Sequence, residues 1–148
     1  MYFKKLAATA IFTLLAPAAW ADAAITITNA KSFETAPSAM VGGGFLDITN
    51  TGTEDDRLIA IIADFPRVEL HTTEFTDGIA RMMHVDGIPI PAGATVQLAP
   101  GGFHVMFMGL QGDPLEDGET IPATLVFEKS GEVEITFDVV KRDMQTSN

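Results

Sequence analysis

Short runs of β-branched and aromatic residues, separated by turn residues, recur along the chain from residue 24 onwards. Ala24–Asn29 and Gly44–Asn50 alternate apolar and polar positions, as half-buried strands do. Arg57–Ala63 is almost continuously apolar, which favours a strand that is buried on both faces. No stretch in this part of the sequence sustains a helical period. The pattern therefore predicts an all-β protein.

Turn signals divide the second half of the chain in the same way. Asp77-Gly78 precedes a predicted strand at Ala80–Val85, and Lys129-Ser130-Gly131 predicts a hairpin. Pro89–Gly93 is expected to be a break between strands. The other predicted strands are Arg67–Thr73, Thr95–Leu98, Phe103–Met108, Pro122–Glu128 and Glu132–Val140. About nine short strands at close spacing favour a single domain, an antiparallel β-sandwich or Greek-key barrel.

The first 21 residues have the pattern of a secretory signal peptide. Lys4 and Lys5 precede an apolar run, and Ala19-Trp20-Ala21 is a small-x-small cleavage site. We therefore expect export to the periplasm, cleavage near Ala21/Asp22 and no membrane anchor afterwards. The domain boundaries predicted are 1–21 for the signal peptide, 22–140 for the β-domain and 141–148 for a flexible polar tail.

Charge and cysteine content exclude several classes of function. The chain has 9 Lys and Arg against 20 Asp and Glu, a formal net charge of −11, so no basic face for nucleic acid can be assembled. Cysteine is absent, which excludes disulfides, thiolate zinc sites, iron–sulfur clusters and cysteine nucleophiles.

Histidine and methionine gather in one part of the sequence, between residues 71 and 108. Within it, His104-Val105-Met106 is the most informative segment, because residues i and i+2 of a strand point to the same face. His104 and Met106 therefore present an imidazole beside a thioether. Such nitrogen and sulfur donors suit Cu(I), whereas calcium and magnesium prefer oxygen. The acidic chain would help to attract and retain the cation.

The same residues also have ordinary structural interpretations. Methionine often fills gaps in a core, and a lone buried histidine is usually hydrogen-bonded there. Met83 neighbours Met82 and points to the opposite face of a strand, so we predict it in the core. Met108 is expected to shield a site rather than to bind metal. His84 is expected on the surface, with a weak accessory donor as the alternative.

Other candidate motifs do not support a function. Val41–Gly44 precedes a strand, whereas a phosphate-binding loop needs a following helix. Glu54-Asp55-Asp56 lacks the spacing of a calcium loop and is expected to be a solvated turn. Ser38 and Ser130 lie in no nucleophile context, so serine hydrolysis is not expected.

The spacing of the whole histidine and methionine set is far more specific than any of its parts. His71, Met82, His104 and Met106 follow the pattern H-x10-M-x21-H-x-M. This pattern resembles the signature of the PCuAC family of periplasmic copper chaperones. Flanking segments resemble that family too, over about residues 24–140. They are Phe45–Asn50, Val68–His71, Asp77–Met82, Ile90–Gly93 and Pro100–Met106.

The resemblance implies a cupredoxin-like β-sandwich that binds one Cu(I) through His71, Met82, His104 and Met106. It also implies a monomeric chaperone, not an enzyme, that delivers copper to a respiratory oxidase centre or to a thiol-containing assembly partner. Two alternatives remain open at this point. One is a copper storage or detoxification protein without an acceptor, and the other is a plain β-sandwich interaction module. A second copper site in the tail is not expected, because only Met144 is present there.

Overall fold

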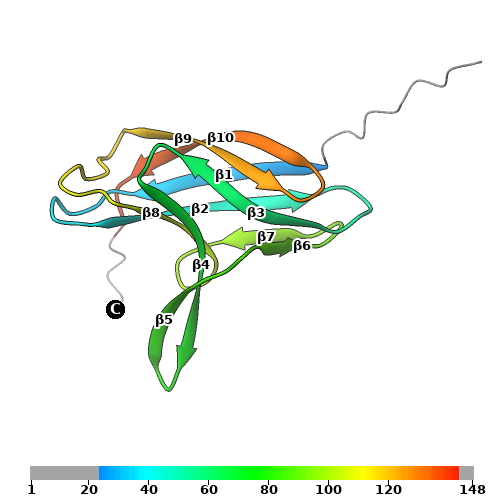
Figure 1. The fold of residues 1–148 in the computed structure, drawn as a ribbon, viewed down its shortest axis with the longest axis horizontal. Coiled ribbons are helices and arrows are strands. Elements are labelled where there is room, and N and C mark those ends of the chain that lie inside the picture. The colour runs from blue at the N-terminus through cyan, green and yellow to red at the C-terminus, as the bar shows by residue number, and fades with distance from the viewer. Residues whose placement is uncertain (1–23, 144–148) are drawn as a thin grey trace, which may run out of the picture.

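The computed structural model describes residues 24–143 as ten β-strands joined by turns and loops (Figure 1). The strands are β1 (Ile25–Phe33), β2 (Val41–Asn50), β3 (Asp56–Ala63), β4 (Arg67–Thr76), β5 (Ile79–His84), β6 (Ile88–Ile90), β7 (Thr95–Leu98), β8 (His104–Met108), β9 (Thr120–Phe127) and β10 (Gly131–Val140). The predicted signal peptide and residues 144–148 lie outside the described part. In residues 24–143 there is no helix long and apolar enough to cross a membrane.

The strands form one sheet in the order β5-β4-β8-β2-β1-β10-β9-β3-β6, and β7 pairs with β2 on the side of the path. The sheet curls until β3, near one end, contacts β4, near the other. The apolar faces of the strands thereby enclose one core. Its most deeply buried members are Leu46, Ile48, Leu58, Ile88, Ile90, Leu98, Val105, Phe107, Leu125, Phe137 and Val139. The prediction of an all-β, cupredoxin-like sandwich is confirmed.

Two details of the sheet differ from the expected pattern. β1 and β10 pair in parallel, with Ser32 opposite Val139, so the sheet is not wholly antiparallel. The predicted break at Pro89–Gly93 begins too early, because Ile88–Ile90 forms β6. β6 is the edge strand of the sheet and pairs only with β3. Proline is tolerated in an edge strand, because its missing N–H can face the side where there is no neighbouring strand to bond.

The predictions for the start and burial of β3 were wrong. Ile59 and Ile62 are 41% and 58% exposed, so the strand is buried on one face only. No layer covers its outer face, because the strand lies within a single curled sheet rather than between two layers. Asp56, expected in a solvated turn, is a buried residue of this strand.

Both predicted hairpin turns are present. Asp77 and Gly78 have positive φ angles of 52° and 73° and join β4 to β5, with Thr76 opposite Ile79. Two successive positive φ values suit the twist of a two-residue hairpin loop, and glycine adopts them without steric cost. The β4–β5 hairpin projects away from the rest of the sheet (Figure 1). All six residues of β5 are exposed as a result.

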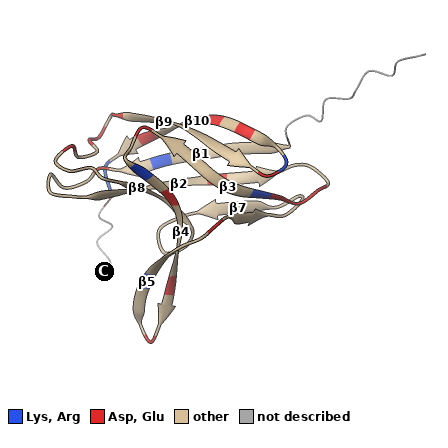
Figure 2. Cartoon of the chain, viewed as in Figure 1, with Lys and Arg blue, Asp and Glu red and all other residues tan. Residues whose placement is uncertain are grey.

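Acidic residues are spread along loops and strands of the described chain, and the less numerous Lys and Arg residues are scattered between them (Figure 2).

Candidate metal centre

Three imidazoles form a row across the strands at the base of the β4–β5 hairpin. His71 on β4 pairs with His104 on β8, and on its other side it pairs with His84 on β5. The ring centroids of His71 and His104 are 5.9 Å apart, and those of His71 and His84 are 6.0 Å apart. Directly opposite residues of antiparallel strands share a face, so the register alone brings these side chains together.

His71 and His104 each have one ring nitrogen that is already engaged. Nδ1 of His104 lies 3.0 Å from the carbonyl oxygen of Gly102, and Nε2 of His71 lies 2.8 Å from Oε2 of Glu69. A carbonyl or carboxylate oxygen can only accept, so the proton of each ring lies on the engaged nitrogen. The opposite nitrogen of each ring therefore carries a lone pair.

These opposite nitrogens are the two buried side-chain polar atoms without a hydrogen-bond partner among residues 24–143. They are Nδ1 of His71 and Nε2 of His104. A buried polar atom without a partner is costly, so natural folds retain it only where something else uses it. A metal-binding histidine has this arrangement: one nitrogen is fixed by an outer partner, and the other is free for the ion.

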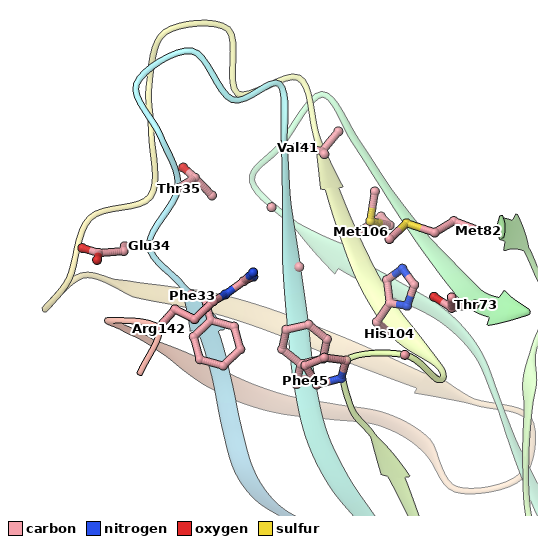
Figure 3. A pocket seen from close by; sticks show the side chains of 14 residues that line it. Phe33, Glu34, Thr35, Val41, Phe45, Thr73, Met82, His104, Met106 and Arg142 are labelled. Carbon is pink, nitrogen blue, oxygen red and sulfur yellow. The ribbon is translucent and has the colours of Figure 1, made fainter. Parts of the chain in front are cut away.

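Two thioethers lie beside this pair of histidines. Met106 follows His104 by two residues on β8 and is opposite Glu69 on β4. Met82 comes from β5, where it is opposite Thr73. Figure 3 shows Met82 and Met106 pointing toward each other from these two strands, close to His104. The structure thus places all four sequence-predicted residues around one end of the sheet.

A groove of about 330 Å³ opens beside His104, Met106 and Met82. Its wall on β2 includes Gly42 and Gly43, and Phe33 and Phe45 form its floor (Figure 3). A Cβ at Gly43 would lie 3.0 Å from the Phe45 ring, closer than carbon atoms normally approach. The glycine run in Val41–Gly44 therefore serves close packing next to the histidine and methionine cluster.

Burial differs strongly among the four residues. His104 is 4% exposed, His71 and Met106 are half-buried, and Met82 is 62% exposed. The reason is topological, because β8 is an inner strand whereas β5 is the edge strand of the projecting hairpin. Three of the residues are held by the sheet, and the fourth is presented by an exposed arm.

Glu69 was not assigned by the sequence analysis, although it lies within a segment quoted there. The hydrogen bond from His71 holds the pKa of Glu69 below its usual value, against the opposing effect of burial, and the positive charge of Arg67 adds to the lowering. Arg67 Nε is 3.0 Å from Glu69 Oε1. Strand alternation places residues 69 and 71 on one face, and this signal was sufficient to predict the contact.

The neighbouring residues had mixed outcomes. Met83 is 42% exposed, so its prediction as a core residue was wrong: the hairpin projects beyond the core, and neither face of β5 is covered. The sulfur of Met108 lies 3.1 Å from Arg67 Nε, which gives it a partner other than a metal. His84 is half-exposed, as expected, but its ring is also in edge contact with His71.

One family model matches most of the chain, and this match decides the family. The LpqE-like model, which describes lipoproteins, matches residues 25–139. The chain belongs to the LpqE-like family. A relative named as lipoprotein Lxx21020, from Leifsonia xyli subsp. xyli (strain CTCB07), is 37% identical over 99 residues. That match spans 66% of this chain and 59% of the relative, so the relative is considerably longer than the matched part.

Solved structures of PCuAC domains resemble this LpqE-like chain over most of its length. A copper-bound PCuAC domain from PmoF2 is 28% identical, covers 80% of this chain and 94% of its own, and has a TM-score of 0.66. The Cu(I) form of DR1885 from Deinococcus radiodurans is 29% identical over 77% of this chain and 76% of its own, with a TM-score of 0.62. The resemblance to PCuAC proteins stated from the sequence is confirmed.

Proposed function

We propose that this protein is an exported, monomeric Cu(I) metallochaperone rather than an enzyme. One Cu(I) would be held by Nδ1 of His71, Nε2 of His104 and the sulfurs of Met82 and Met106. The observation that carries the proposal is the pair of buried, unpartnered ring nitrogens on His71 and His104. The copper-bound and Cu(I) forms of similar PCuAC domains support the choice of ion.

The donor set fits a cargo that must be released. Neutral imidazoles and thioethers are soft ligands that suit Cu(I), but they bind it less tightly than thiolates do. Met82 is the most exposed of the four residues, so an incoming thiolate can displace its sulfur first. His71 and His104 would retain the ion until the acceptor supplies a second ligand. Copper would then pass by ligand exchange without becoming free.

We further propose that the acceptor is a thiol-containing copper protein or the copper centre of a respiratory oxidase, in the periplasm. The signal-like residues 1–21 and the lipoprotein relatives support export. Mass spectrometry of the exported protein should find the N-terminus at or near Asp22. Recovery of the intact chain from the cytoplasm would contradict this part of the proposal.

Metal titration of the mature protein tests the central proposal. We expect one Cu(I) per chain, measured by competition with a chromogenic chelator, and much weaker binding of Zn(II). X-ray absorption at the copper edge should show both nitrogen and sulfur neighbours. A spectrum with only nitrogen and oxygen would refute the ligand set. A transfer assay with a dithiol acceptor separates a chaperone from a storage protein, since only the former should release its copper rapidly.

A further inference from the structure

A second cluster of metal-binding atoms adjoins the proposed Cu(I) ligands on the outer side of His71. Glu69 Oε2 lies 2.8 Å from His71 Nε2 and 3.6 Å from His84 Nδ1. The ligand atoms offered by these three residues all lie within 4.8 Å of one another. Only His71 is common to this cluster and to the Cu(I) set. The cluster therefore has a different composition, two nitrogens and one carboxylate oxygen without sulfur.

Neighbouring residues contact two donors of this cluster, His84 and Glu69. Asp86 Oδ1 lies 3.3 Å from His84 Nε2, and Nδ1 on the other side of that ring faces Glu69. Arg67 holds the other oxygen of Glu69, Oε1, at 3.0 Å, which leaves Oε2 directed at the two rings. Outer contacts of this kind fix the tautomers and ring orientations of histidine ligands in metal sites.

The donor types decide which ion such a cluster would take. Imidazole nitrogen and carboxylate oxygen suit divalent transition metals, and Cu(II) binds most strongly among those of the first row. Thioethers, in contrast, favour Cu(I). His84 is half-exposed, so solvent can supply the remaining ligands of an open site. We propose that Glu69, His71 and His84 form a Cu(II) site next to the Cu(I) site and that the two share the imidazole of His71.

Sharing one neutral imidazole makes the two sites compete. The ring carries one proton and so offers one lone pair at a time. With the proton on Nε2, Nδ1 is available to the Cu(I) set. Binding of Cu(II) at Nε2 requires the proton to move to Nδ1, which removes His71 from the Cu(I) set. Because coupling between sites is reciprocal, each ion should weaken the other by the same factor.

The existence of the Cu(II) site does not depend on the proposed function, whereas the competition rests on the proposed Cu(I) set. The experiment therefore measures the two separately. Cu(II) is titrated into the apo protein against glycine as a competing ligand, for the wild type, His84→Gln and Met82→Leu. Ag(I), a soft ion that does not exchange electrons with Cu(II) under these conditions, replaces Cu(I) in the coupled titrations.

We expect His84→Gln to weaken Cu(II) binding at least about 10-fold and to leave Ag(I) binding within about twofold. Met82→Leu is the matched control, because it should weaken Ag(I) binding and leave Cu(II) binding unchanged. Electron paramagnetic resonance of bound Cu(II) should show two coupled nitrogens in the wild type and one in His84→Gln. In the wild type, Ag(I) loaded beforehand should weaken Cu(II) at least about 10-fold.

Three results would overturn the proposal. Equal Cu(II) affinity in the wild type and His84→Gln would mean that the cluster is only an ion-pair network. Loss of both ions in both variants would mean a single site. Cu(II) binding that is unaffected by Ag(I) would refute the shared imidazole. Failure of Ag(I) to bind at all, with His84-dependent Cu(II) binding intact, would refute the proposed Cu(I) function alone and would leave the Cu(II) site standing.

Discussion

The β4–β5 and β9–β10 hairpins each involve a carboxylate with a lowered pKa, but the two carboxylates serve different purposes. At the β9–β10 hairpin, Asp56 accepts hydrogen bonds from the backbone of Arg57, Lys129 and Ser130 and from the Ser130 hydroxyl. At the β4–β5 hairpin, Glu69 faces only side chains, those of Arg67, His71 and His84. The first carboxylate closes a turn, and the second orients imidazoles.

The surroundings differ in the same way. Near Asp56 the donors and acceptors of the turn satisfy one another, as a structural network requires. Near Glu69 the fold leaves His71 Nδ1 and His104 Nε2 unpartnered and exposes Met82. A region in which every buried polar group has a hydrogen-bond partner contributes stability. A region in which buried polar groups lack partners can offer them to a ligand. Pairing, rather than charge, thus distinguishes the carboxylate that closes a turn from the one that faces the proposed metal ligands.

Removal of Asp56 should have the largest effect on stability. Asp56→Ala leaves three backbone N–H groups and a hydroxyl without their acceptor, so we expect a loss of about 3 kcal/mol in the free energy of unfolding. Urea melts of the apo protein measure it. The proposed ligands lie on β4, β5 and β8 rather than at the β9–β10 turn, so the affinity of the folded variant for Cu(I) should stay unchanged. A coupled loss would show that the two regions are not independent.

Removal of one thioether should have the largest effect on metal binding. Met82→Leu conserves volume and removes the sulfur. We expect the Cu(I) affinity to fall about 100-fold or more, because removing a ligand should cost at least as much affinity as removing a residue that only orients a ligand. Met83→Leu is the control, because Met83 points to the opposite face of β5. Chelator competition measures both variants. If Met83→Leu lost Cu(I) binding and Met82→Leu kept it, the assigned register would be off by one residue.

Glu69→Ala should weaken Cu(I) binding and leave stability unchanged, the reverse of the effects expected for Asp56→Ala. Without the carboxylate, His71 loses the contact that fixes its tautomer, so Cu(I) affinity should fall by about 10–100-fold. The melting temperature of the apo protein should not change, because Glu69 accepts no backbone hydrogen bond in the described residues. Thermal melts and chelator competition on the same preparation test it, and a large drop in melting temperature would contradict the comparison.

Acid should weaken the Asp56 hairpin. Burial alone would raise the pKa of Asp56, but hydrogen bonds from Ser130, Lys129 and Arg57 outweigh it and hold the pKa below the usual 3.8. The stabilising effect is therefore complete above about pH 4, where the unfolded carboxyl is ionised, and is lost as the pH falls through the folded pKa. In Asp56→Asn this dependence should vanish, so the stability difference between wild type and variant should shrink below pH 4. A constant difference would contradict it.

The smallest effect is expected for Met83→Ala. Because Met83 is 42% exposed, truncation should cost less than about 1 kcal/mol, compared with about 2–5 kcal/mol at a buried methionine. A urea melt decides between the two values. A loss in the larger range would mean that the β4–β5 hairpin is covered in solution.

The sequence by itself determined the fold class, the turns and the four candidate ligands. Alternation with a period of two is a local property, so it identified strands and put His104 and Met106 on one face. The same rule places Glu69 and His71 on one face of β4. The spacing of His71, Met82, His104 and Met106 needed no structure, because it resembles a family pattern.

Only the tertiary structure decided how those faces are covered and which strands meet. Met83, Ile59 and Ile62 are exposed because β5 projects from the sheet and β3 has no layer over its outer face. Asp56 is buried because the chain returns 73 residues later to place Lys129 beside it. The row of His84, His71 and His104 arises from the register of β5, β4 and β8. Such contacts depend on pairing between distant segments, which local patterns do not encode.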